Sequence, residues 1–294
     1  MQENGTLRED IEAIARGAGE IMLAAQHERP GKTGIAENAD TVEAKEGHVN
    51  FVTKYDKAVQ DYLYERLEKR LPEAHFLGEE EGQEVFLPEY ANGYTFVVDP
   101  IDGTTNFIKG FHPSVTSIGL LKDGKPFLGV VYCPETGQMF SAQAGEGAYE
   151  NGTRIRSSRQ PLADSLFGVG TATYYEELQQ PTFDLMLHYE KRGIDLRRTG
   201  SAAYDICMVA SGRTGLFVEL RLGLWDYAAA SVILTEAGGK ITNVFGEELP
   251  FTGKSSILAA SEGVRKEDYL PKGFSRGYLE GKAAPASGAD ETES

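Results

Sequence analysis

The stretch that most restricts the fold of this chain is an apolar run, residues 94–98, followed by Asp99-Pro-Ile-Asp-Gly-Thr. A short apolar run of this kind is typical of a buried strand. The proline and the glycine after it favour a tight turn, which can bring the carboxylates of Asp99 and Asp102 and the carbonyls between them to one point. Hard divalent cations such as Mg²⁺ prefer oxygen ligands in this arrangement. Acidic residues at the carboxyl end of a strand also lie where open α/β sheets carry their sites, so the stretch predicts a metal site.

The composition excludes several classes of partner. The chain has 294 residues, 40% of them hydrophobic and 25% charged, which allows one large domain or two closely packed halves. With a net charge of −16, we expect neither nucleic acid nor an anionic membrane surface as a partner. No apolar run reaches the roughly 18 residues needed to cross a bilayer, and residues 1–5 lack the pattern of a signal peptide. We therefore expect a cytoplasmic protein.

The spacing of apolar residues predicts helices first and strands afterwards. One helix is expected over residues 6–26, and a second begins at a capping box formed by Thr53 and Asp56 and ends before Pro72. From residue 94 to about 156, apolar runs separated by turn signals predict antiparallel hairpins. Beyond these, helices are expected over 184–191, 201–211 and 226–237, and strands over 216–220 and 257–260. This order indicates stacked layers of sheet and helix. Residues 30–40 are expected to form a mobile loop and 281–294 a disordered tail.

Two further acidic groups accompany the first: Glu79-Glu80-Glu81, just upstream and after a glycine, and Asp226, far downstream and after Trp225. Taken alone, the glutamates can be a solvated run of charge, and Asp226 can be only a helix N-cap. If these carboxylates converge with Asp99 and Asp102, they repel one another strongly unless a cation lies among them.

Five blocks in order give the chain a family resemblance. They are residues 50–56 (Asn-Phe-Val-Thr-Lys-Tyr-Asp), 78–80 (Gly-Glu-Glu), 99–104, 198–205 (Arg-Thr-Gly-Ser-Ala-Ala-Tyr-Asp) and 225–226 (Trp-Asp). Over roughly residues 7–262 the sequence resembles the inositol monophosphatase family of Mg²⁺-dependent, lithium-sensitive phosphatases. The resemblance implies an α-β-α-β-α sandwich, with mixed and antiparallel sheets and with helices between and outside them. It also implies a single catalytic domain over 1–280, in which 1–160 is the metal-site half and 161–280 the substrate-side half.

The resemblance also implies a set of metal ligands for two or three Mg²⁺ ions. Asp99 would bridge two ions, Glu79 would complete the first, and Asp102 and Asp226 would complete the second. The backbone carbonyl of Ile101 would be a further ligand. Glu80 would orient waters nearby, with a surface glutamate as the alternative, and Lys45 lies at a spacing where the family often carries a lysine near the metal.

Two residues are the candidates for handling the attacking water. By resemblance, the hydroxyl of Thr104 positions the water and Asp56 accepts a hydrogen bond from that hydroxyl and helps to remove a proton. Each residue also has a plainer interpretation, because Thr104 can satisfy a turn and Asp56 can complete the capping box. Both interpretations of Asp56 can hold at once.

Substrate contacts are implied for a second group of residues: Gly103, Thr104, Gly200, Ser201, Ala202 and Glu219. Backbone N–H groups of Gly103 and Thr104 could hold a phosphate oxygen. Residues 200–202 open a helix, whose N-terminus can receive anions or hydroxyls. Glu219 matches a position that binds a sugar or inositol hydroxyl. Arg221 stands where many relatives have glycine, so it could alter the pocket or form an ion pair with Glu219.

These observations predict Mg²⁺-dependent hydrolysis of a small phosphate monoester, foremost inositol monophosphate, by metal-activated water. Fructose-1,6-bisphosphatase, histidinol-phosphatase and nucleoside-bisphosphate phosphatase activities are the alternatives within the superfamily. A metal-stabilised regulatory protein is the non-enzymatic alternative, but it would not need the pair of Thr104 and Asp56. The substrate would be a small phosphorylated polyol or sugar, and a homodimer is possible by resemblance. Cys133 and Cys207 are expected to be small buried hydrophobes, with no base near Cys133, which argues against a covalent intermediate.

Overall fold

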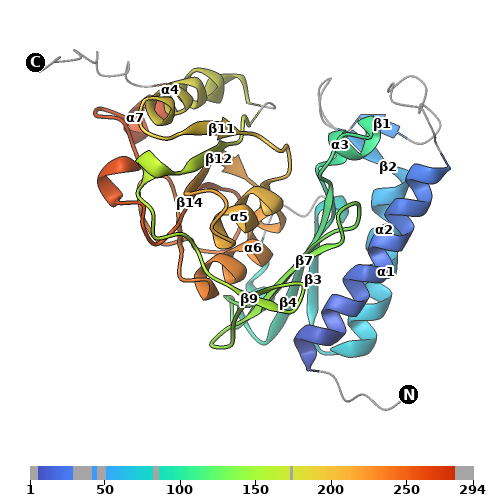
Figure 1. Cartoon of the computed structure of the whole chain (residues 1–294). Coiled ribbons are helices and arrows are strands. Elements are labelled where there is room, and N and C mark those ends of the chain that lie inside the picture. Colours follow the sequence, from blue (N-terminus) through green and yellow to red (C-terminus); the bar gives the residue numbers. More distant parts are fainter. Residues whose placement is uncertain (1–5, 29–41, 45–50, 82–85, 173–174, 282–294) are drawn as a thin grey trace, which may run out of the picture.

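The computed structural model describes residues 6–28, 42–44, 51–81, 86–172 and 175–281, which form layers in the order helix, sheet, helix, sheet, helix (Figure 1). A seven-stranded sheet and a five-stranded sheet lie on either side of a central helical layer, and further helices cover their outer faces. The predicted α-β-α-β-α sandwich with mixed and antiparallel sheets is confirmed. The predicted loop over 30–40, the tail beyond residue 281 and Lys45 lie outside the described residues. Within the described part, the helices are too short or too polar to cross a membrane.

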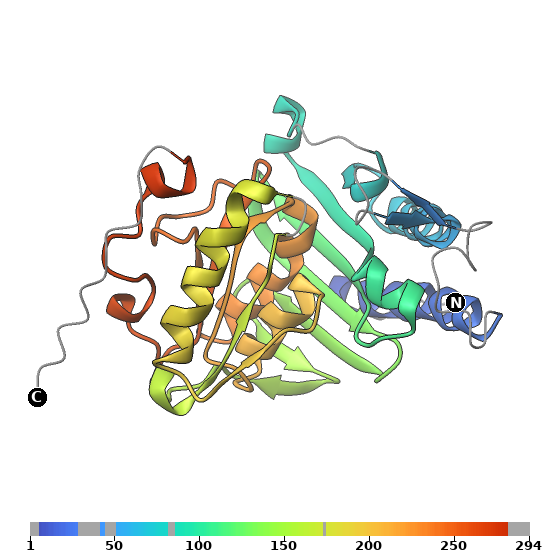
Figure 2. The ribbon, with the colours of Figure 1, turned by 90° about the horizontal axis from the view of Figure 1, so that it is seen from above.

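Helices α1 (Leu7–His27) and α2 (Lys54–Arg70) pack against each other and cover the outer face of the seven-stranded sheet (Figures 1 and 2). Each begins at a capping box, Thr6 with Glu9 and Thr53 with Asp56, in which side chain and backbone N–H bond reciprocally. Both helices follow the predicted ranges within two residues. A short antiparallel pair, β1 (Val42–Ala44) and β2 (Phe51–Thr53), leads into α2.

The seven-stranded sheet follows the sequence, in the order β3 to β9. Only β3 and β4 are parallel, and every later pair is antiparallel. At two of its hairpin turns, Asp123-Gly124 and Asn151-Gly152, both residues have positive φ, as tight hairpin turns require. The hairpins predicted over 94–156 are therefore confirmed. The strands are β3 (His75–Gly78), β4 (Tyr94–Asp102), β5 (Val115–Lys122), β6 (Lys125–Cys133), β7 (Gln138–Gln143), β8 (Gly147–Glu150) and β9 (Thr153–Ile155).

Helices α5 (Ala202–Ala210) and α6 (Leu224–Glu236) form the central layer. Small residues let α6 approach the seven-stranded sheet closely. A Cβ added to Gly129 would lie 2.1 Å from the carbonyl oxygen of Ala229, and one added to Gly119 would lie 3.0 Å from the Cβ of Ala228. Glycine at these two strand positions therefore allows backbone-to-backbone packing that any side chain would block.

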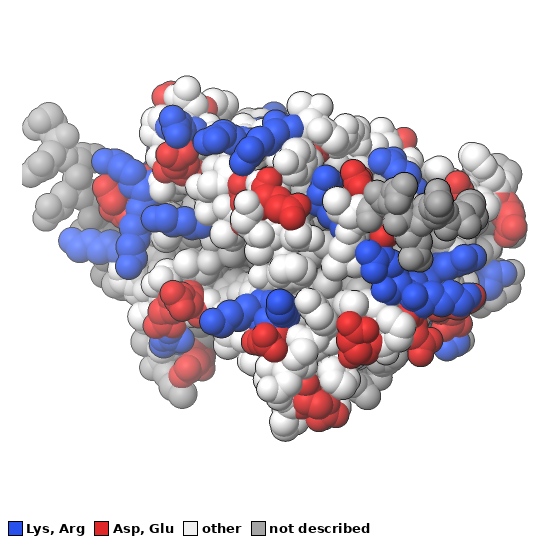
Figure 3. Space-filling model, turned by 90° about the horizontal axis from the view of Figure 1, so that it is seen from below, with Lys and Arg blue, Asp and Glu red and all other residues white. Residues whose placement is uncertain are grey.

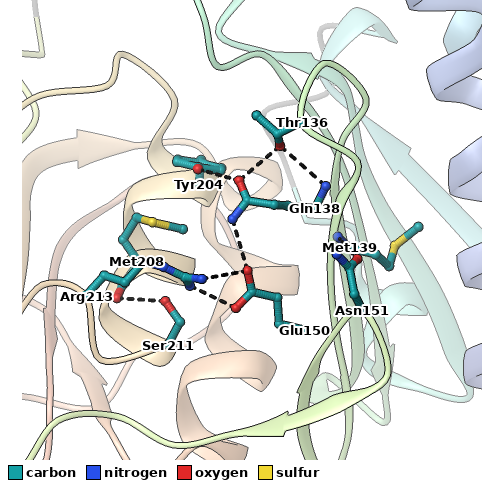
Figure 4. A network of polar contacts seen from close by, with 9 residues as sticks. All are labelled: Thr136, Gln138, Met139, Glu150, Asn151, Tyr204, Met208, Ser211 and Arg213. Carbon is teal, nitrogen blue, oxygen red and sulfur yellow. Dashed lines mark hydrogen bonds and ion pairs between the residues drawn. The ribbon is translucent and has the colours of Figure 1, made fainter.

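A polar network fastens α5 to β7 and β8 of this sheet (Figure 4). The hydroxyl of Tyr204 on α5 donates to Oε1 of Gln138 on β7 at 2.8 Å, and Nε2 of Gln138 donates to Glu150 on β8 at 3.0 Å. Arg213, just beyond α5, holds both oxygens of Glu150 at 2.9 and 2.8 Å. Bidentate guanidinium–carboxylate pairs fix orientation as well as distance, so this network restrains the position of α5.

The five-stranded sheet has the order β11-β10-β12-β14-β13. Strands β11 and β12 are parallel to β10, and β14 is antiparallel to β12 and β13. Its strands are β10 (Leu166–Val169), β11 (Asp195–Arg197), β12 (Leu216–Leu222), β13 (Lys240–Thr242) and β14 (Ser255–Ala260). Helices α4 (Gln179–Glu190) and α7 (Arg276–Leu279) lie outside this sheet (Figure 1). Short 3₁₀ turns are η2 (Glu79–Glu81), η3 (Pro88–Ala91), η4 (Leu162–Asp164), η5 (Glu176–Leu178) and η6 (Lys266–Asp268).

The elements that differ from the prediction include α3, α4 and β4. Helix α4 begins five residues before residue 184, because Pro181 falls in the first turn, where its missing N–H has no intrahelical partner. A short helix, α3 (Thr104–Lys109), was not predicted; it starts after Gly103, whose φ of 91° turns the chain out of β4. Strand β4 continues through Asp102, where the sequence predicted an end before Asp99.

Candidate metal centre

The end of β4 is a bulged strand and not the free turn that the sequence predicted. Asp99 pairs with Ser117 of β5, and Asp102 pairs with Val115, so three steps along β4 face two along β5. The extra residue is a β-bulge, which bends a strand and redirects its side chains. The N–H of Ile101 donates to Oδ1 of Asp99 at 3.0 Å across the bulge. The bulge thus lets two carboxylates three positions apart approach the same point.

Three carboxylates meet at this point. Each of Asp99, Asp102 and Asp226 offers an oxygen, and these oxygens lie within 4.8 Å of one another. Asp226 is the third residue of α6 and not its N-cap, and it accepts a hydrogen bond from the N–H of Gly223 at 2.7 Å. Glu79 follows β3, the parallel neighbour of β4, and its charge raises the pKa of all three aspartates. The sheet and α6 therefore bring three of the four proposed carboxylates together, and Glu79 acts on these three electrostatically.

Burial and mutual repulsion disfavour the ionised form of these carboxylates. Burial raises the pKa of Asp99 and of Asp226 well above the usual carboxyl range, and the charges of Glu79 and Asp102 raise both further. Burial raises the pKa of Asp102 to about 6, because hydrogen bonds from Ser201 and Ala203 offset part of the effect. A divalent cation among the carboxylates would stabilise their ionised form, because its positive charge offsets their mutual repulsion. An all-oxygen donor set is the one that Mg²⁺ prefers, so the residues fit the ion that the resemblance implies.

Helix α5 supports one of these carboxylates directly. Oδ2 of Asp102 accepts hydrogen bonds from the hydroxyl of Ser201 at 2.7 Å and from the N–H of Ala203 at 2.8 Å. Ser201 is the N-cap of α5, and Gly200 before it has a φ of 86°. A Cβ added to Gly103 would lie 3.4 Å from the Gly200 carbonyl, so the two predicted substrate segments lie against each other. The polar groups at Ser201 and Ala203 are, however, engaged with Asp102.

The hydroxyl of Thr104, at the start of α3, lies between two acceptors. Its Oγ1 is 3.1 Å from the carbonyl of Ile101 and 3.5 Å from Oδ1 of Asp56. The other carboxylate oxygen of Asp56 accepts from the N–H of Thr53 at 2.7 Å and from its hydroxyl at 2.5 Å. Asp56 therefore completes the capping box with one oxygen and approaches Thr104 with the other.

The surroundings of Asp56 favour its protonated form. Burial raises the pKa of Asp56 to about 7, although hydrogen bonds from Thr53 lower it, and the charge of Glu80 raises it further. The N–H of Glu80 donates to Gln60 of α2 at 3.4 Å. Glu80 thus lies close enough to act on Asp56 electrostatically.

Glu219 on β12 is held away from Arg221. Its Oε1 accepts from the N–H of Ala172 at 3.0 Å, and a Cβ at Gly170 would lie 2.0 Å from its Oε2. Burial raises the pKa of Glu219 to about 7, while the Ala172 bond and the charge of Arg198 lower it. The ion pair that the sequence suggested between Glu219 and Arg221 does not form. Arg221 pairs instead with Glu177 at 3.5 Å.

Sequence reasoning missed Asn106 of α3. Its Nδ2 donates to the carbonyl of Pro113 at 2.7 Å and to that of Thr199 at 2.8 Å, which ties α3 to the segment before α5. The contact spans 93 positions, so no local pattern could have revealed it. Asn106 therefore holds together the two segments that flank the cluster.

The cysteines are free and buried, as predicted. The expectation that Cys133 has no base nearby is wrong, because Oε2 of Glu135 lies 3.3 Å from its sulfur. Burial nevertheless raises the pKa of Cys133 to about 11, so the thiol stays protonated at neutral pH.

We expect the metal-free protein to lose thermal stability as pH rises from 5 to 8. Asp102, Asp56 and Glu219 have folded-state pKa values of about 6, 7 and 7, against about 4 in an unfolded chain. The folded state therefore binds more protons in this window, and the free energy of unfolding falls with pH. Mg²⁺ should raise Tm more at pH 8 than at pH 5. Differential scanning fluorimetry with a chelator or with Mg²⁺ at each pH measures this. A chelated protein whose Tm rises from pH 5 to 8 contradicts the charge assignment.

Known proteins share the sequence and the fold of this chain. The sequence matches the inositol monophosphatase family over residues 4–273. It is 35% identical to inositol monophosphatase 1 of Solanum lycopersicum over 92% of this chain and 96% of that protein. It is 34% identical to Nus factor SuhB of Pasteurella multocida over 74% of this chain and 80% of that protein.

Solved structures of two similar proteins share the fold of this chain. The extragenic suppressor protein suhB from Bartonella henselae superposes with a TM-score of 0.78 at 30% identity, covering 90% of this chain and 98% of that one. The inositol monophosphate-bound SaIMPase-II superposes with a TM-score of 0.72 at 27% identity, covering 94% and 95%. The matched residues span the acidic cluster and both sheets, and the chain therefore belongs to the inositol monophosphatase family.

Proposed function

We propose that this protein is a Mg²⁺-dependent phosphatase of small phosphorylated polyols or sugars, foremost inositol monophosphate. The observation that carries the proposal is the approach of Thr104 to Asp56 beside the cluster of three carboxylates. A cluster that merely held metal for stability would not need a hydroxyl paired with a buried carboxylate. The inositol monophosphate in the related SaIMPase-II structure supports the choice of substrate.

The ligands of two or three Mg²⁺ ions would be Glu79, Asp99, Asp102, Asp226 and the carbonyl of Ile101. When bound, such ions neutralise charge on the phosphoryl oxygens, lower the pKa of a water and stabilise the leaving oxygen. The protein's part is to hold these oxygens together, which the β4 bulge, α6 and the N-terminus of α5 accomplish.

Thr104 and Asp56 would then move the proton of the attacking water. A hydroxyl has one hydrogen to donate, so Thr104 bonds either to the Ile101 carbonyl or to Asp56. When that carbonyl serves as a ligand, Asp56 remains as the acceptor. Thr104 Oγ1 can accept a proton from the water while its own passes to Asp56. A pKa of about 7, raised by burial and further by the charge of Glu80, suits Asp56 to this role at neutral pH.

Substrate would lie between the two glycine-containing segments and Glu219. The N–H groups of Gly103 and Thr104 would face a phosphate oxygen, and residues 200–202 would line the polyol. Glu219 would accept a hydrogen bond from a ring hydroxyl through the oxygen that Ala172 leaves open. The phosphate esters of fructose, histidinol and nucleosides remain the alternative substrates. We also propose a single catalytic domain over 1–280, a cytoplasmic location and a homodimer.

A regulatory role is the second candidate, because Nus factor SuhB is among the relatives. Both roles can use one metal-stabilised fold. They differ in whether Thr104 and Asp56 are needed, since a purely structural role would tolerate their replacement.

We expect phosphate release from inositol monophosphate to depend strictly on Mg²⁺. Without a cation, the clustered carboxylates repel the phosphate that they should help to bind. Exhaustive chelation should abolish activity, added Mg²⁺ should restore it, and lithium should inhibit it. The assay compares a panel of phosphate esters at matched concentrations with and without chelator. Full activity in chelated protein contradicts the mechanism, and a different ester with the highest kcat/KM reassigns the substrate.

A further inference from the structure

A chain of hydrogen-bonded residues joins Asp102 of the candidate metal centre to a distant part of the seven-stranded sheet. Oδ2 of Asp102 accepts from the hydroxyl of Ser201 at 2.7 Å, and the oxygen of that hydroxyl accepts from the N–H of Tyr204 at 3.3 Å. The hydroxyl of Tyr204 donates in turn to Oε1 of Gln138 on β7 at 2.8 Å (Figure 4). Strand β7 lies three strands away from β4 in the sheet. The carboxylate of Asp102 is therefore linked to the sheet at a second place, through the first turn of α5.

The amide of Gln138 fixes the place of the Tyr204 hydroxyl. Its Oε1 accepts from Tyr204 and, at 3.0 Å, from the hydroxyl of Thr136, while its Nε2 donates to Oε1 of Glu150 at 3.0 Å. Two donors face the oxygen and one acceptor faces the nitrogen, so only one orientation of the amide satisfies all three partners. Strands β7 and β8, which carry Gln138 and Glu150, therefore determine where the Tyr204 hydroxyl is held.

Arg213 anchors the other end of α5 on the same glutamate. Its guanidinium donates to both oxygens of Glu150 at 2.9 and 2.8 Å, and its N–H donates to the carbonyl of Met208, in the last turn of α5, at 3.0 Å. Basic and acidic side chains lie interspersed on the face shown in Figure 3, and fully exposed pairs of this kind contribute little. The side chain of Arg213 is 47% exposed, but that of Glu150 is only 16% exposed. Although burial raises the pKa of Glu150, the hydrogen bonds from Arg213 and Gln138 hold it below the usual value, so the pair is charged.

These directional bonds add what apolar packing does not supply. The ring of Tyr204 packs edge to face on Phe140 of β7 at 6.2 Å, and the other residues of α5 are buried. Such contacts are non-directional, so they hold the helix against its neighbours without fixing its position along its own axis. The hydrogen bonds of Tyr204 and Arg213 fix that position. Mg²⁺ requires nearly octahedral geometry, so a small displacement of Ser201 would weaken the ion's contact with Asp102.

We propose that Tyr204 is a positioning residue of the metal centre, which fixes α5 so that Ser201 and Ala203 hold Asp102 in the geometry that a Mg²⁺ ion needs. This role of Tyr204 rests on the proposed function, because it concerns the ion that Asp102 would bind. Burial raises the pKa of Tyr204 to about 12, so its hydroxyl remains a donor at neutral pH. Tyr204 acts on Asp102 only through Ser201 and the first turn of α5.

Calorimetric titration of Mg²⁺ into the metal-free protein and its Tyr204→Phe variant tests this role. Phenylalanine keeps the ring on Phe140 and removes only the hydroxyl. We expect Kd for the ion that Asp102 completes to rise roughly three- to tenfold, while the other ion binds as in the wild type. Arg213→Gln should weaken the same binding step. Because both residues act through α5, the double variant should raise Kd by less than the product of the two single effects.

Tyr189→Phe is the matched control. Tyr189 on α4 is buried and donates its hydroxyl to the carbonyl of Tyr269, outside the five-stranded sheet. Its loss should lower Tm but leave Mg²⁺ binding unaltered, and circular dichroism shows whether each variant folds. An unaltered Mg²⁺ Kd in folded Tyr204→Phe, an equal change in Tyr189→Phe, or multiplicative effects of Tyr204→Phe and Arg213→Gln overturn the role of Tyr204 alone. A wild-type protein that binds no Mg²⁺ overturns the proposed metal centre and the role of Tyr204 with it.

Discussion

Asp99→Asn should abolish phosphate release while stabilising the metal-free protein. As the proposed bridging ligand, Asp99 would hold both ions, and loss of about 4 kcal/mol of charge stabilisation would lower the rate by about 10³-fold. The same change removes one of three mutually repelling carboxylates but leaves Oδ1 to accept the N–H of Ile101. The Tm of the chelated variant should therefore rise, by about 2–4 °C for each kcal/mol gained. Activity and stability thus move in opposite directions, which a folding defect cannot produce.

Asp102→Asn is the comparison that isolates bridging. It removes one ligand of the second ion only, so high Mg²⁺ should partly restore its rate but not that of Asp99→Asn. The amide oxygen can still face the hydroxyl of Ser201 and the N–H of Ala203, which keeps α5 in place. Phosphate-release rates of both variants, measured over a range of Mg²⁺ concentrations, test whether Asp99 bridges two ions. Complete rescue of Asp99→Asn by Mg²⁺ counts against a bridging role.

Thr104→Ala should lower kcat by roughly 10²–10⁴-fold with little change in KM, as lost proton-transfer assistance does. Asp56→Asn should lower kcat to a similar degree, because an amide oxygen can hold the hydroxyl but cannot take up its proton. If the two residues act as a unit, the double variant should be little slower than either single variant. Steady-state kinetics of the three variants at saturating Mg²⁺ provide the measurement.

Two controls accompany these variants. Thr105→Ala changes the exposed neighbouring threonine of α3 and should leave kcat unaltered. Because Asp56 also completes the capping box of α2, circular dichroism and Tm must show that Asp56→Asn is folded. Unchanged kcat in folded Thr104→Ala would mean that the water needs no help from the hydroxyl, and multiplicative losses would mean that the residues act independently. Either result favours the regulatory candidate or a different proton path.

Local patterns in the sequence predicted the elements that local physics forms. The capping box predicted at Thr53 marks where α2 begins, since a cap needs only residues three positions apart, and the spacing of apolar residues predicted α1. Positive-φ turns such as Asn151-Gly152 likewise set the hairpins. The five blocks, through their resemblance, supplied the sandwich and the candidate residues, which periodicity alone would not have given. Boundaries were less certain, as α4 and the unpredicted α3 show.

Only the tertiary structure decided how those residues meet. Asp99 and Asp226 lie 127 positions apart, and α6 reaches β4 because glycines in β5 and β6 leave room for its alanines. The same packing gives Asp102 the hydroxyl of Ser201, a contact across 99 positions. The sequence alone determined which residues can carry charge, cap a helix or turn a chain, because these are properties of a residue and its near neighbours. Distance, burial and the pKa shifts that follow from them depend on groups brought together across the chain, so only the fold determines them.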